Sequence, residues 1–392
     1  MEYYYICSEC GRRYKISRHI MVCTQCSQKQ DADEPLRGVL EVGIEGKFNK
    51  KFNIFDLLPV EREYFPPIPV GNTPLWTPLN LREATGFSGL YIKDDSLNPT
   101  GSLKDRASFL VAAFAVREKI KDVVVASTGN AASSMAGVGA AAALNIKIFI
   151  PASAPQAKRV QSLQYGADVV LVDGNYDKAY ELSMEYTMEH GVLSRNTAYN
   201  PLTIEGKKTA ALEIFKQLEG VPDYMFIPTG DGVILGGVYK GFKDLLNAGL
   251  IDKMPIIYAV QAEGSCAISM AFKEGGFNKS YRSRTIADSI AVDIPRNGYY
   301  ALKYLKAYGG RCVVVEDSEI IGAQKELAST TGLFAEPAAS ASFAGFIKVK
   351  DDIPSSSRVV LLITGSGLKD INTAMQGLIS QTEKRRLTTK RL

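Results

Sequence analysis

A single lysine, Lys104, stands in a loop of small polar residues between an apolar, strand-like run and a helical one. The loop reads Asn-Pro-Thr-Gly-Ser-Leu-Lys-Asp-Arg over residues 98–106, after the run at 90–93 and before the apolar run at 107–116. A lysine placed there can lie at the base of a cleft, where desolvation favours the neutral amine, a nucleophile for carbonyl groups. Pyridoxal phosphate (PLP) is a cofactor held by such a lysine. An ordinary lysine at a helix start is the alternative, and the better interpretation if the loop is taken alone.

A second polar loop follows the β-branched run 122–126 and precedes an alanine-rich helix. It contains Ser127, Thr128, Gly129 and Asn130. Main-chain N–H groups at a helix start favour an anion such as a substrate carboxylate. Simple capping of the helix by Ser or Thr explains the loop about equally well.

A third loop, rich in glycine, spans residues 229–237 after the strand-like run 224–228. Glycine-rich loops between a strand and a helix hold phosphate with main-chain N–H groups, although tight turns also use glycine. The loop lacks both the Walker lysine and the dinucleotide Gly-x-Gly-x-x-Gly spacing, so neither nucleotide class is favoured. Asp231 is unfavourable beside a phosphate, and we expect its carboxylate to turn away and accept from main-chain N–H groups.

A fourth loop, Thr-Gly-Ser-Gly-Leu-Lys-Asp at residues 364–370, follows the apolar run 359–363. The hydroxyl of Thr364 is suited to meet the pyridine nitrogen of PLP. A neutral hydroxyl does not force that nitrogen to be protonated, which suits elimination and replacement more than transamination. A glycine-rich turn with a capping threonine is the alternative.

Four of the six cysteines form two Cys-x-x-Cys pairs separated by twelve residues: Cys7, Cys10, Cys23 and Cys26. This spacing predicts a four-thiolate zinc site. All four ligands come from protein, so the zinc is expected to be structural. A ribbon that has lost its metal and a redox pair are the alternatives.

Alternation of short β-branched runs with helical runs, for example 168–172 followed by 176–190, predicts parallel sheets with helical crossovers. We therefore expect an α/β protein with two open, twisted, mainly parallel sheets flanked by helices, and a small N-terminal zinc-ribbon-like module. Ligands should collect at the carboxyl ends of the strands. The expected units are the module at 1–35, a large PLP-binding domain at 36–111 and 213–380, a small mobile substrate domain at 112–212, and a basic tail at 381–392.

Composition limits the function. The 392 residues are 46% hydrophobic and 22% charged, with a net charge of +4, typical of a globular enzyme and too weakly basic to indicate nucleic acid or a membrane surface. No secretory signal is visible, and no apolar stretch is long enough to span a bilayer. We expect a cytoplasmic protein with reduced thiols. Neither of the two histidines, His19 and His190, has a partner signature, so lysine remains the expected proton carrier.

The four loops together resemble those of the fold type II PLP enzymes, also called the tryptophan synthase β family, and among them the threonine synthases. Segment 98–106 resembles the cofactor-lysine motif, and 126–132 the substrate-carboxylate loop. The segment Asn-Pro-Leu-Thr-Ile-Glu-Gly-Lys-Lys-Thr at 200–209 is similar to the family's Asn-Pro…Glu-Gly-x-Lys-Thr, and 335–338 with 364–370 to its late motifs. The resemblance covers residues 70–375, with the motifs in the family's order.

The resemblance implies a role for individual residues. Lys104 would join PLP and act as base, Asn130 would contact the ring hydroxyl, and Thr364 would meet the ring nitrogen. The phosphate cup, defined as residues 230–234, would consist of Gly230, Asp231, Gly232, Val233 and Ile234, and the expected substrate contacts are Ser127, Thr128, Asn196 and Thr197. The implied reaction converts O-phospho-L-homoserine and water to L-threonine and phosphate, in a homodimer acting on a small-molecule substrate.

This sequence departs from the usual threonine synthase pattern at three places that bear on the substrate. Threonine synthases usually have His at the position of Ser366, commonly have Arg near the position of Thr203, and have a phosphate cup richer in asparagine. Arg195, Lys207 and Lys208 are nearby in the sequence and are the candidates for the missing positive charge. The ordinary interpretation of Lys207 and Lys208 is that they are exposed lysines on a helix. A β-elimination or β-replacement enzyme, such as a serine/threonine dehydratase or a phosphoserine-dependent sulfur transferase, is the alternative within the fold. A zinc-ribbon binding or regulatory protein on a degenerate scaffold is the alternative outside enzymes.

Overall fold

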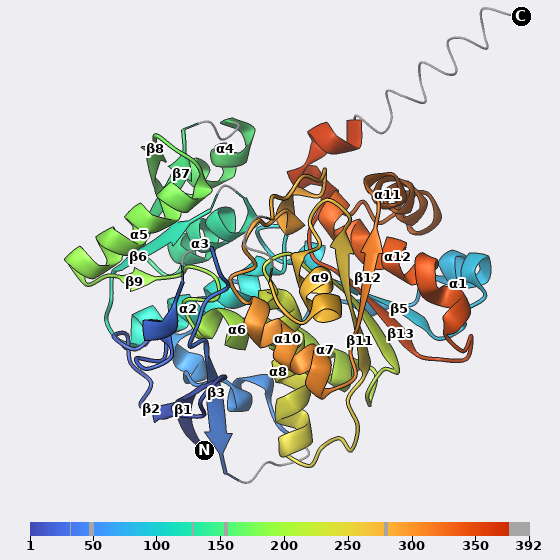
Figure 1. Ribbon diagram of the computed structural model, residues 1–392, viewed down its shortest axis with the longest axis horizontal. Coiled ribbons are helices and arrows are strands. Elements are labelled where there is room, and N and C mark those ends of the chain that lie inside the picture. Colours follow the sequence, from blue (N-terminus) through green and yellow to red (C-terminus); the bar gives the residue numbers. More distant parts are fainter. Residues whose placement is uncertain (32, 47–50, 128, 153–155, 278–280, 376–392) are drawn as a thin grey trace, which may run out of the picture.

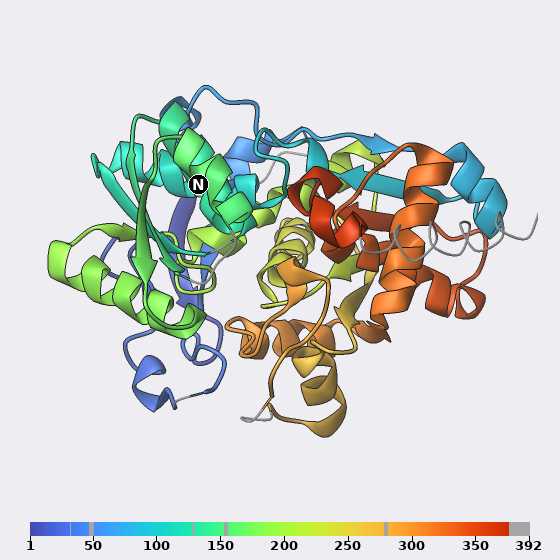
Figure 2. The same ribbon diagram turned by 90° about the horizontal axis from the view of Figure 1, so that it is seen from above.

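The computed structural model describes residues 1–31, 33–46, 51–127, 129–152, 156–277 and 281–375. The expected tail at 381–392 and Thr128 therefore lie outside the described residues. Three sheets organise the described chain: a small antiparallel sheet at the N-terminus, a four-stranded sheet and a six-stranded sheet. Figures 1 and 2 show the two larger sheets in two lobes, with their helices packed around them.

The N-terminal sheet pairs β1 (Glu2–Cys7) with β2 (Arg13–Tyr14) and β3 (Leu40–Glu45), both antiparallel. The expected limit of this module at residue 35 leaves out β3, which pairs with all six residues of β1. The N-terminal module therefore extends to residue 45, because the main-chain N–H and C=O groups of β1 are paired by those of β3. Buried side chains of this sheet share one hydrophobic cluster with the four-stranded lobe, among them Tyr5 and Val42.

The four-stranded sheet has the order β8-β7-β6-β9 and is parallel throughout. Its strands are β6 (Asp122–Ala126), β7 (Asn145–Pro151), β8 (Asp168–Val172) and β9 (Leu193–Ser194). The helices that connect them are α3 (Asn130–Ala141), α4 (Gln156–Gln164) and α5 (Tyr176–His190). All four strands fall within the segment expected to form the small domain. The valines of β6 are buried on both faces, as expected for a covered parallel sheet.

The six-stranded sheet has the order β12-β11-β10-β13-β5-β4, and β4 is its antiparallel edge. Its strands are β4 (Leu75–Trp76), β5 (Leu90–Asp94), β10 (Tyr224–Pro228), β11 (Ile256–Ala262), β12 (Arg311–Val315) and β13 (Val359–Ile363). Helices α1 (Leu79–Thr85), α7 (Thr209–Gln217), α8 (Val233–Asn247), α9 (Ala267–Glu274), α10 (Gly298–Ala307), α11 (Asp317–Thr331) and α12 (Pro337–Val349) belong to the same lobe. Two open, mainly parallel sheets with flanking helices confirm the predicted architecture.

Two central helices, α2 (Lys104–Arg117) and α6 (Leu202–Lys207), run between the lobes and pack against each other. Gly206 makes this packing possible, because a Cβ there would lie 2.3 Å from the main-chain oxygen of Arg106. Strands β5, β10 and β13 are neighbours in the large sheet and parallel to one another. Their carboxyl ends therefore open onto the same edge, where the loops with Lys104, the glycines and Thr364 begin.

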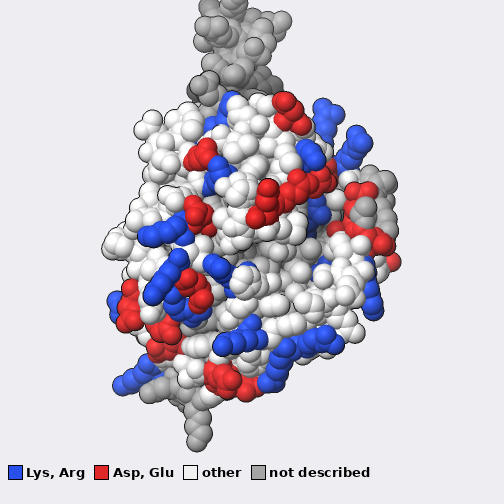
Figure 3. Space-filling model, turned by 90° about the vertical axis from the view of Figure 1, so that its left-hand side faces the viewer, with Lys and Arg blue, Asp and Glu red and all other residues white. Residues whose placement is uncertain are grey.

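No helix among the described residues has the length and apolar character needed to cross a membrane. The face shown in Figure 3 intermixes Lys and Arg with Asp and Glu. Over that face no large area carries one sign of charge, in line with the modest net charge.

Candidate active site

Lys104 is the first residue of α2, and the loop that carries it is pinned to the loop after β13. The N–H of Leu103 donates to the Thr364 carbonyl oxygen at 2.9 Å, and the N–H of Ser366 donates to the Gly101 carbonyl oxygen at 3.0 Å. These bonds hold the start of α2, where Lys104 lies, beside Thr364. Burial lowers the pKa of the Lys104 amine, with Asp231 and Glu336 opposing that effect. A lysine in this setting is more easily neutral and nucleophilic than one in water.

A buried ion network fixes the start of α2. Arg106 donates to Asp95 at 2.6 Å and to Glu213 of α7 at 2.6 Å, and Lys93 of β5 donates to Glu213 at 2.6 Å. Burial alone would raise the pKa of Glu213, but Arg106 and Lys93 lower it to about 2. The arginine of the cofactor-lysine motif therefore joins β5, α2 and α7, and so holds Lys104 in place.

The phosphate cup forms a tight turn between β10 and α8. Gly232 has φ +85°, a conformation that strongly favours glycine. The carboxylate of Asp231 accepts from the N–H of Val233 at 2.9 Å, so it turns back to the main chain as expected. Asn297 supports the turn from outside. Its main-chain N–H donates to the Asp231 carbonyl oxygen at 2.9 Å, and its side-chain amide donates to the Gly232 carbonyl oxygen at 3.1 Å. Sequence reasoning missed Asn297, which no motif marks.

Asn130 opens α3 and faces a carboxylate that sequence reasoning left without a role. Its side-chain amide donates to Glu336 at 2.9 Å and to the hydroxyl of Ser289 at 3.2 Å. Glu336 is buried, and burial raises the pKa of its carboxyl group. Gly365 leaves room for it, because a Cβ at that position would lie 2.5 Å from the Glu336 carboxyl carbon. The motif at 335–338 was visible in the sequence, but the direction of its carboxylate was not.

Ser127 and Thr197 line one cavity with Asp231, although they follow different strands, β6 and β9. This cavity has a volume of about 350 Å³ and also touches Tyr176 and Arg296. The hydroxyl of Ser127 accepts from the N–H of Gly129 at 3.2 Å, which shapes the loop before α3. A second cavity of about 500 Å³ lies by Asn130 and Glu336, between the lobes.

Asn196 lies behind the cavity rather than in it. Its side-chain oxygen accepts from the N–H of Ala126 at 2.8 Å, and its amide donates to the hydroxyl of Ser183 at 2.8 Å. These bonds tie the end of β6 to α5. A contact of Asn196 with substrate would have to replace one of them.

Lys207 and Lys208 are both buried, so the interpretation as exposed helix lysines is wrong. Both α2 and α8 pack against α6, so a side chain pointing to either neighbour is buried. Lys208 forms ion pairs with Glu205 and, at 2.7 Å, with Asp244, which also pairs with Lys240 at 2.5 Å. That positive charge is balanced within the protein and is not available to a ligand. Arg195 is buried as well and donates to the hydroxyl of Thr197 at 3.0 Å.

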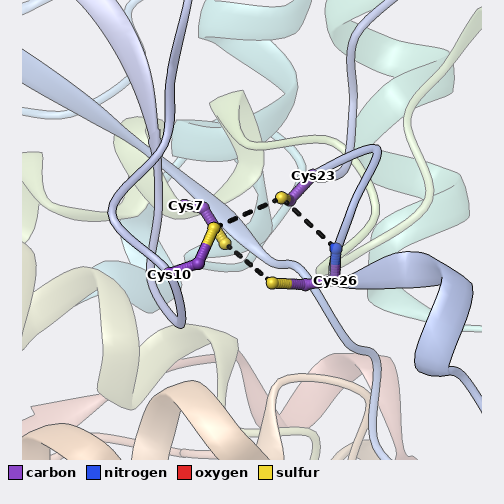
Figure 4. Close-up of side chains that lie close together, drawn as sticks. All are labelled: Cys7, Cys10, Cys23 and Cys26. Carbon is purple, nitrogen blue, oxygen red and sulfur yellow. Dashed lines mark hydrogen bonds between the residues drawn. The ribbon is translucent and has the colours of Figure 1, made fainter.

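The four cysteines of the N-terminal module converge on one point (Figure 4). Their sulfur atoms all lie within 4.8 Å of one another, with 3.8 Å between Cys7 and Cys26 and 3.7 Å between Cys10 and Cys23. All four are free thiols. Two short turns bring the pairs together, and β1 carries the first cysteine.

Comparison with known proteins places the chain in a family. Residues 68–365 match the family of pyridoxal-phosphate dependent enzymes, and the chain belongs to this family. A threonine synthase of Methanosarcina acetivorans is 34% identical over 95% of this chain and 94% of its own length. A threonine synthase of Methanocaldococcus jannaschii is 33% identical over 94% of both chains, and one of Mycobacterium tuberculosis is 34% identical over 83% of this chain and 89% of its own. The predicted family resemblance is confirmed.

Solved structures share the fold at low sequence identity. Threonine deaminase isoform 2 of Solanum lycopersicum is 22% identical, covers 85% of this chain and 90% of its own, and has a TM-score of 0.69. Maize serine racemase is 21% identical, covers 81% of this chain and 94% of its own, and has a TM-score of 0.67. The chain therefore has the fold of the type II PLP enzymes.

Proposed function

We propose that this chain converts O-phospho-L-homoserine and water to L-threonine and phosphate with the help of PLP. The observation that carries the proposal is the desolvated Lys104, held between the glycine-rich start of α8 and the loop of Thr364. The threonine synthases that align with this chain over nearly its whole length support the choice of substrate.

The residues present fit PLP. The cup at 230–234 offers main-chain N–H groups at the start of a 15-residue helix, the kind of site that binds a phosphate group. Lys104, Asn130 and Thr364 would meet the aldehyde carbon, the ring hydroxyl and the ring nitrogen. When bound, PLP supplies an electron sink for the carbanion character that develops next to the amino group.

Protein groups would carry out the remaining tasks. The neutral amine of Lys104 would take the proton from the substrate α-carbon and return a proton later. Ser127 and the N–H groups at the start of α3 would hold the substrate carboxylate, with Thr128 expected beside them. Phosphate would leave from the γ-carbon, and water would add at the β-carbon. Glu336, which binds Asn130, would orient that amide rather than transfer a proton to substrate.

The units and assembly follow from the same proposal. The small domain at 112–212 would close on substrate against the large domain at 36–111 and 213–380, because the cavity beside Asn130 lies between the two lobes. We propose a homodimer, as the family resemblance implies, to be tested by light scattering. Free, closely grouped thiols suit a reducing compartment, and we propose the cytoplasm.

We also propose that the cysteines hold one structural zinc ion. Tetrahedral zinc with Zn–S bonds of about 2.3 Å places its sulfur ligands about 3.8 Å apart. The sulfur separations of 3.8 Å and 3.7 Å match that spacing and are far longer than a disulfide bond.

A panel of substrates tests the proposed reaction. The purified protein with PLP is incubated with O-phospho-L-homoserine, O-phospho-L-serine, L-serine and L-threonine, and phosphate, threonine, ammonia and ketoacid are measured. We expect equal amounts of phosphate and threonine from the first compound alone. The alternative, a β-eliminating or β-replacing enzyme, is favoured by the uncharged, buried Thr203, and ketoacid release from the other substrates would establish it instead.

A further inference from the structure

The ammonium group of Lys207 is buried without a partner. The side chain is 1% exposed and its Nζ makes no hydrogen bond. Other buried lysines differ: Lys93, Lys208 and Lys240 each pair with a carboxylate. Within the part of the chain that the structure describes, Lys207 is the one lysine with a fully buried, unbonded ammonium.

Lys207 lies where α6 meets the N-terminal half of α8. A Cβ on Gly237 would lie 2.7 Å from the Lys207 Cβ, so the two helices touch at this point. The charges that act on Lys207 are those of Arg195, Lys104 and Asp231. Two of these are positive, and the third turns its carboxylate to the N–H of Val233. The ammonium thus lies near Lys104 and the cup, and no carboxylate of the described residues forms a hydrogen bond or ion pair with it.

This arrangement is unfavourable in the ligand-free protein. Burial, together with the positive charges of Arg195 and Lys104, holds the pKa of Lys207 well below its usual value. An unpaired buried ammonium loses its proton rather than remain charged in an apolar site. A bound dianion would raise the pKa of Lys207 again, because a nearby negative charge favours the protonated form of the lysine.

Lys207 is also the only cation of α6, whose sequence is Leu-Thr-Ile-Glu-Gly-Lys. Thr203 lies one helical turn earlier on the same face and carries no charge; its hydroxyl donates to the Asn200 carbonyl oxygen at 2.8 Å. Lys208 points to the buried acids Glu205 and Asp244. A positive charge on this side of the site can therefore come from α6 only through Lys207.

We propose that Lys207 binds a phosphate monoester at the junction of the cup and α6, and takes up one proton from solvent as it does so. The inference rests on the proposed function for its two sources of phosphate, the cofactor and the phosphorylated substrate. Both present the same chemistry, a tetrahedral dianion. The side chain would then contribute to phosphate recognition in this chain beyond the main-chain N–H groups of the cup.

Binding measurements that need no turnover test the proposal. Lys207→Met, a neutral side chain of similar length, is compared with Lys207→Arg and with Lys216→Met, which removes a cation from the neighbouring helix α7. Titration calorimetry gives the affinity of the PLP-free proteins for PLP and for inorganic phosphate, and the affinity of the PLP-loaded proteins for inorganic phosphate. Repeating the titrations at pH 8 in two buffers of different ionisation enthalpy gives the number of protons taken up.

We expect Lys207→Met to weaken phosphate binding at least tenfold and to abolish the uptake of about one proton, while Lys207→Arg keeps most of the affinity and Lys216→Met keeps both. If Lys207→Met binds phosphate more weakly only in the PLP-free protein, the phosphate of the cofactor is the ligand. If it also binds phosphate more weakly in the PLP-loaded protein, the phosphate of the substrate is the ligand. Unchanged affinity and proton uptake in both states would overturn the proposal, even if the enzyme makes threonine.

Thermal unfolding of the PLP-free proteins excludes a purely structural role. Replacing an unpaired buried cation by an apolar side chain of similar volume should leave the melting temperature unchanged or raise it. A fall of more than about 4 °C, roughly 3 kcal/mol in a chain of this size, would show that the ammonium supports the fold and would overturn the proposal.

Discussion

The chemistry proposed for this chain depends on how environment changes the properties of lysine. Lys104 begins α2, Lys207 ends α6 and Lys208 follows it directly, and all three are removed from bulk water to some degree. Lys208 forms ion pairs with Glu205 and Asp244, whereas burial lowers the pKa of Lys104 and Lys207. The same side chain is therefore suited to structural pairing, to proton transfer and to anion binding in one small region.

Replacement of Lys104 tests the covalent assignment. We expect Lys104→Ala to lose the visible absorbance that PLP gains when joined to protein, and to lose at least about a thousandfold in kcat, because nucleophile and base are removed together. The exposed Lys121→Ala is the matched control and should keep both. Normal absorbance in Lys104→Ala would assign the cofactor to another amine.

At the scale of elements, the sequence predicts strands and helices well where the chain itself sets their limits. The runs 122–126, 224–228 and 359–363 are strands with the predicted ends, and the helix at 176–190 begins and ends as expected. Asn175 caps that helix, and Gly191 ends it in the left-handed conformation, so local chemistry fixes both limits.

Elements that depend on distant partners were not predictable in the same way. The two-residue strand β9 exists because Leu193 and Ser194 pair with β6, and β3 because it pairs with β1. In the site, the glycines, Lys104 and Thr364 could be found by their positions after strands. Glu336, Asn297 and the burial of Lys207 could not, because they depend on how α6, α8 and the loop before α12 meet.

The N-terminal sheet gives a prediction about metal. We expect elemental mass spectrometry to find about one zinc ion per chain in the wild type and less than half that amount in Cys23→Ser. The variant should also unfold at a lower temperature, because a structural zinc contributes to folding. Cys312→Ser, away from the four-cysteine cluster, should keep its zinc. Protein expressed with added zinc and purified under reducing conditions, yet free of metal, would contradict the zinc site.

The ion network around Arg106 gives a prediction about acid stability. The pKa of Glu213 is held at about 2, below its value of 4.5 in the unfolded chain. The folded state is therefore stabilised above pH 4.5, by about 3 kcal/mol for this group, and loses that stability as the pH falls from 4.5 towards 2. Glu213→Gln should cost about 3–5 kcal/mol at pH 7, since it leaves two buried cations short of a partner.

Urea unfolding from pH 7 down to pH 3 measures the effect. The difference in stability between wild type and Glu213→Gln should shrink as the pH falls through this window. Glu45→Gln, which removes a surface ion pair with Arg13, should cost less than about 1 kcal/mol at any pH. A difference that stays constant with pH would show that Glu213 does not carry the predicted shift.

At the scale of the whole molecule, the two lobes touch through polar contacts beside the cavity. Lys369 belongs to the large lobe and donates to Gln161 of α4 at 2.6 Å and to Ser133 of α3 at 3.0 Å. Arg296, also of the large lobe, donates to Asp177 of α5 at 2.8 Å. Such contacts can break and form again without exposing a hydrophobic core, which suits a small domain that moves as a unit.

Small-angle X-ray scattering tests this motion. We expect a non-hydrolysable phosphonate analogue of the substrate to reduce the radius of gyration of the PLP-loaded wild type. Lys369→Met should increase it in the absence of analogue and raise KM more than it lowers kcat, because the closed arrangement loses the two hydrogen bonds that Lys369 donates across the lobes, to Ser133 and Gln161. Lys273→Met, at the exposed end of α9, should match wild type. Identical scattering with and without the analogue would mean that substrate binds to lobes that do not close.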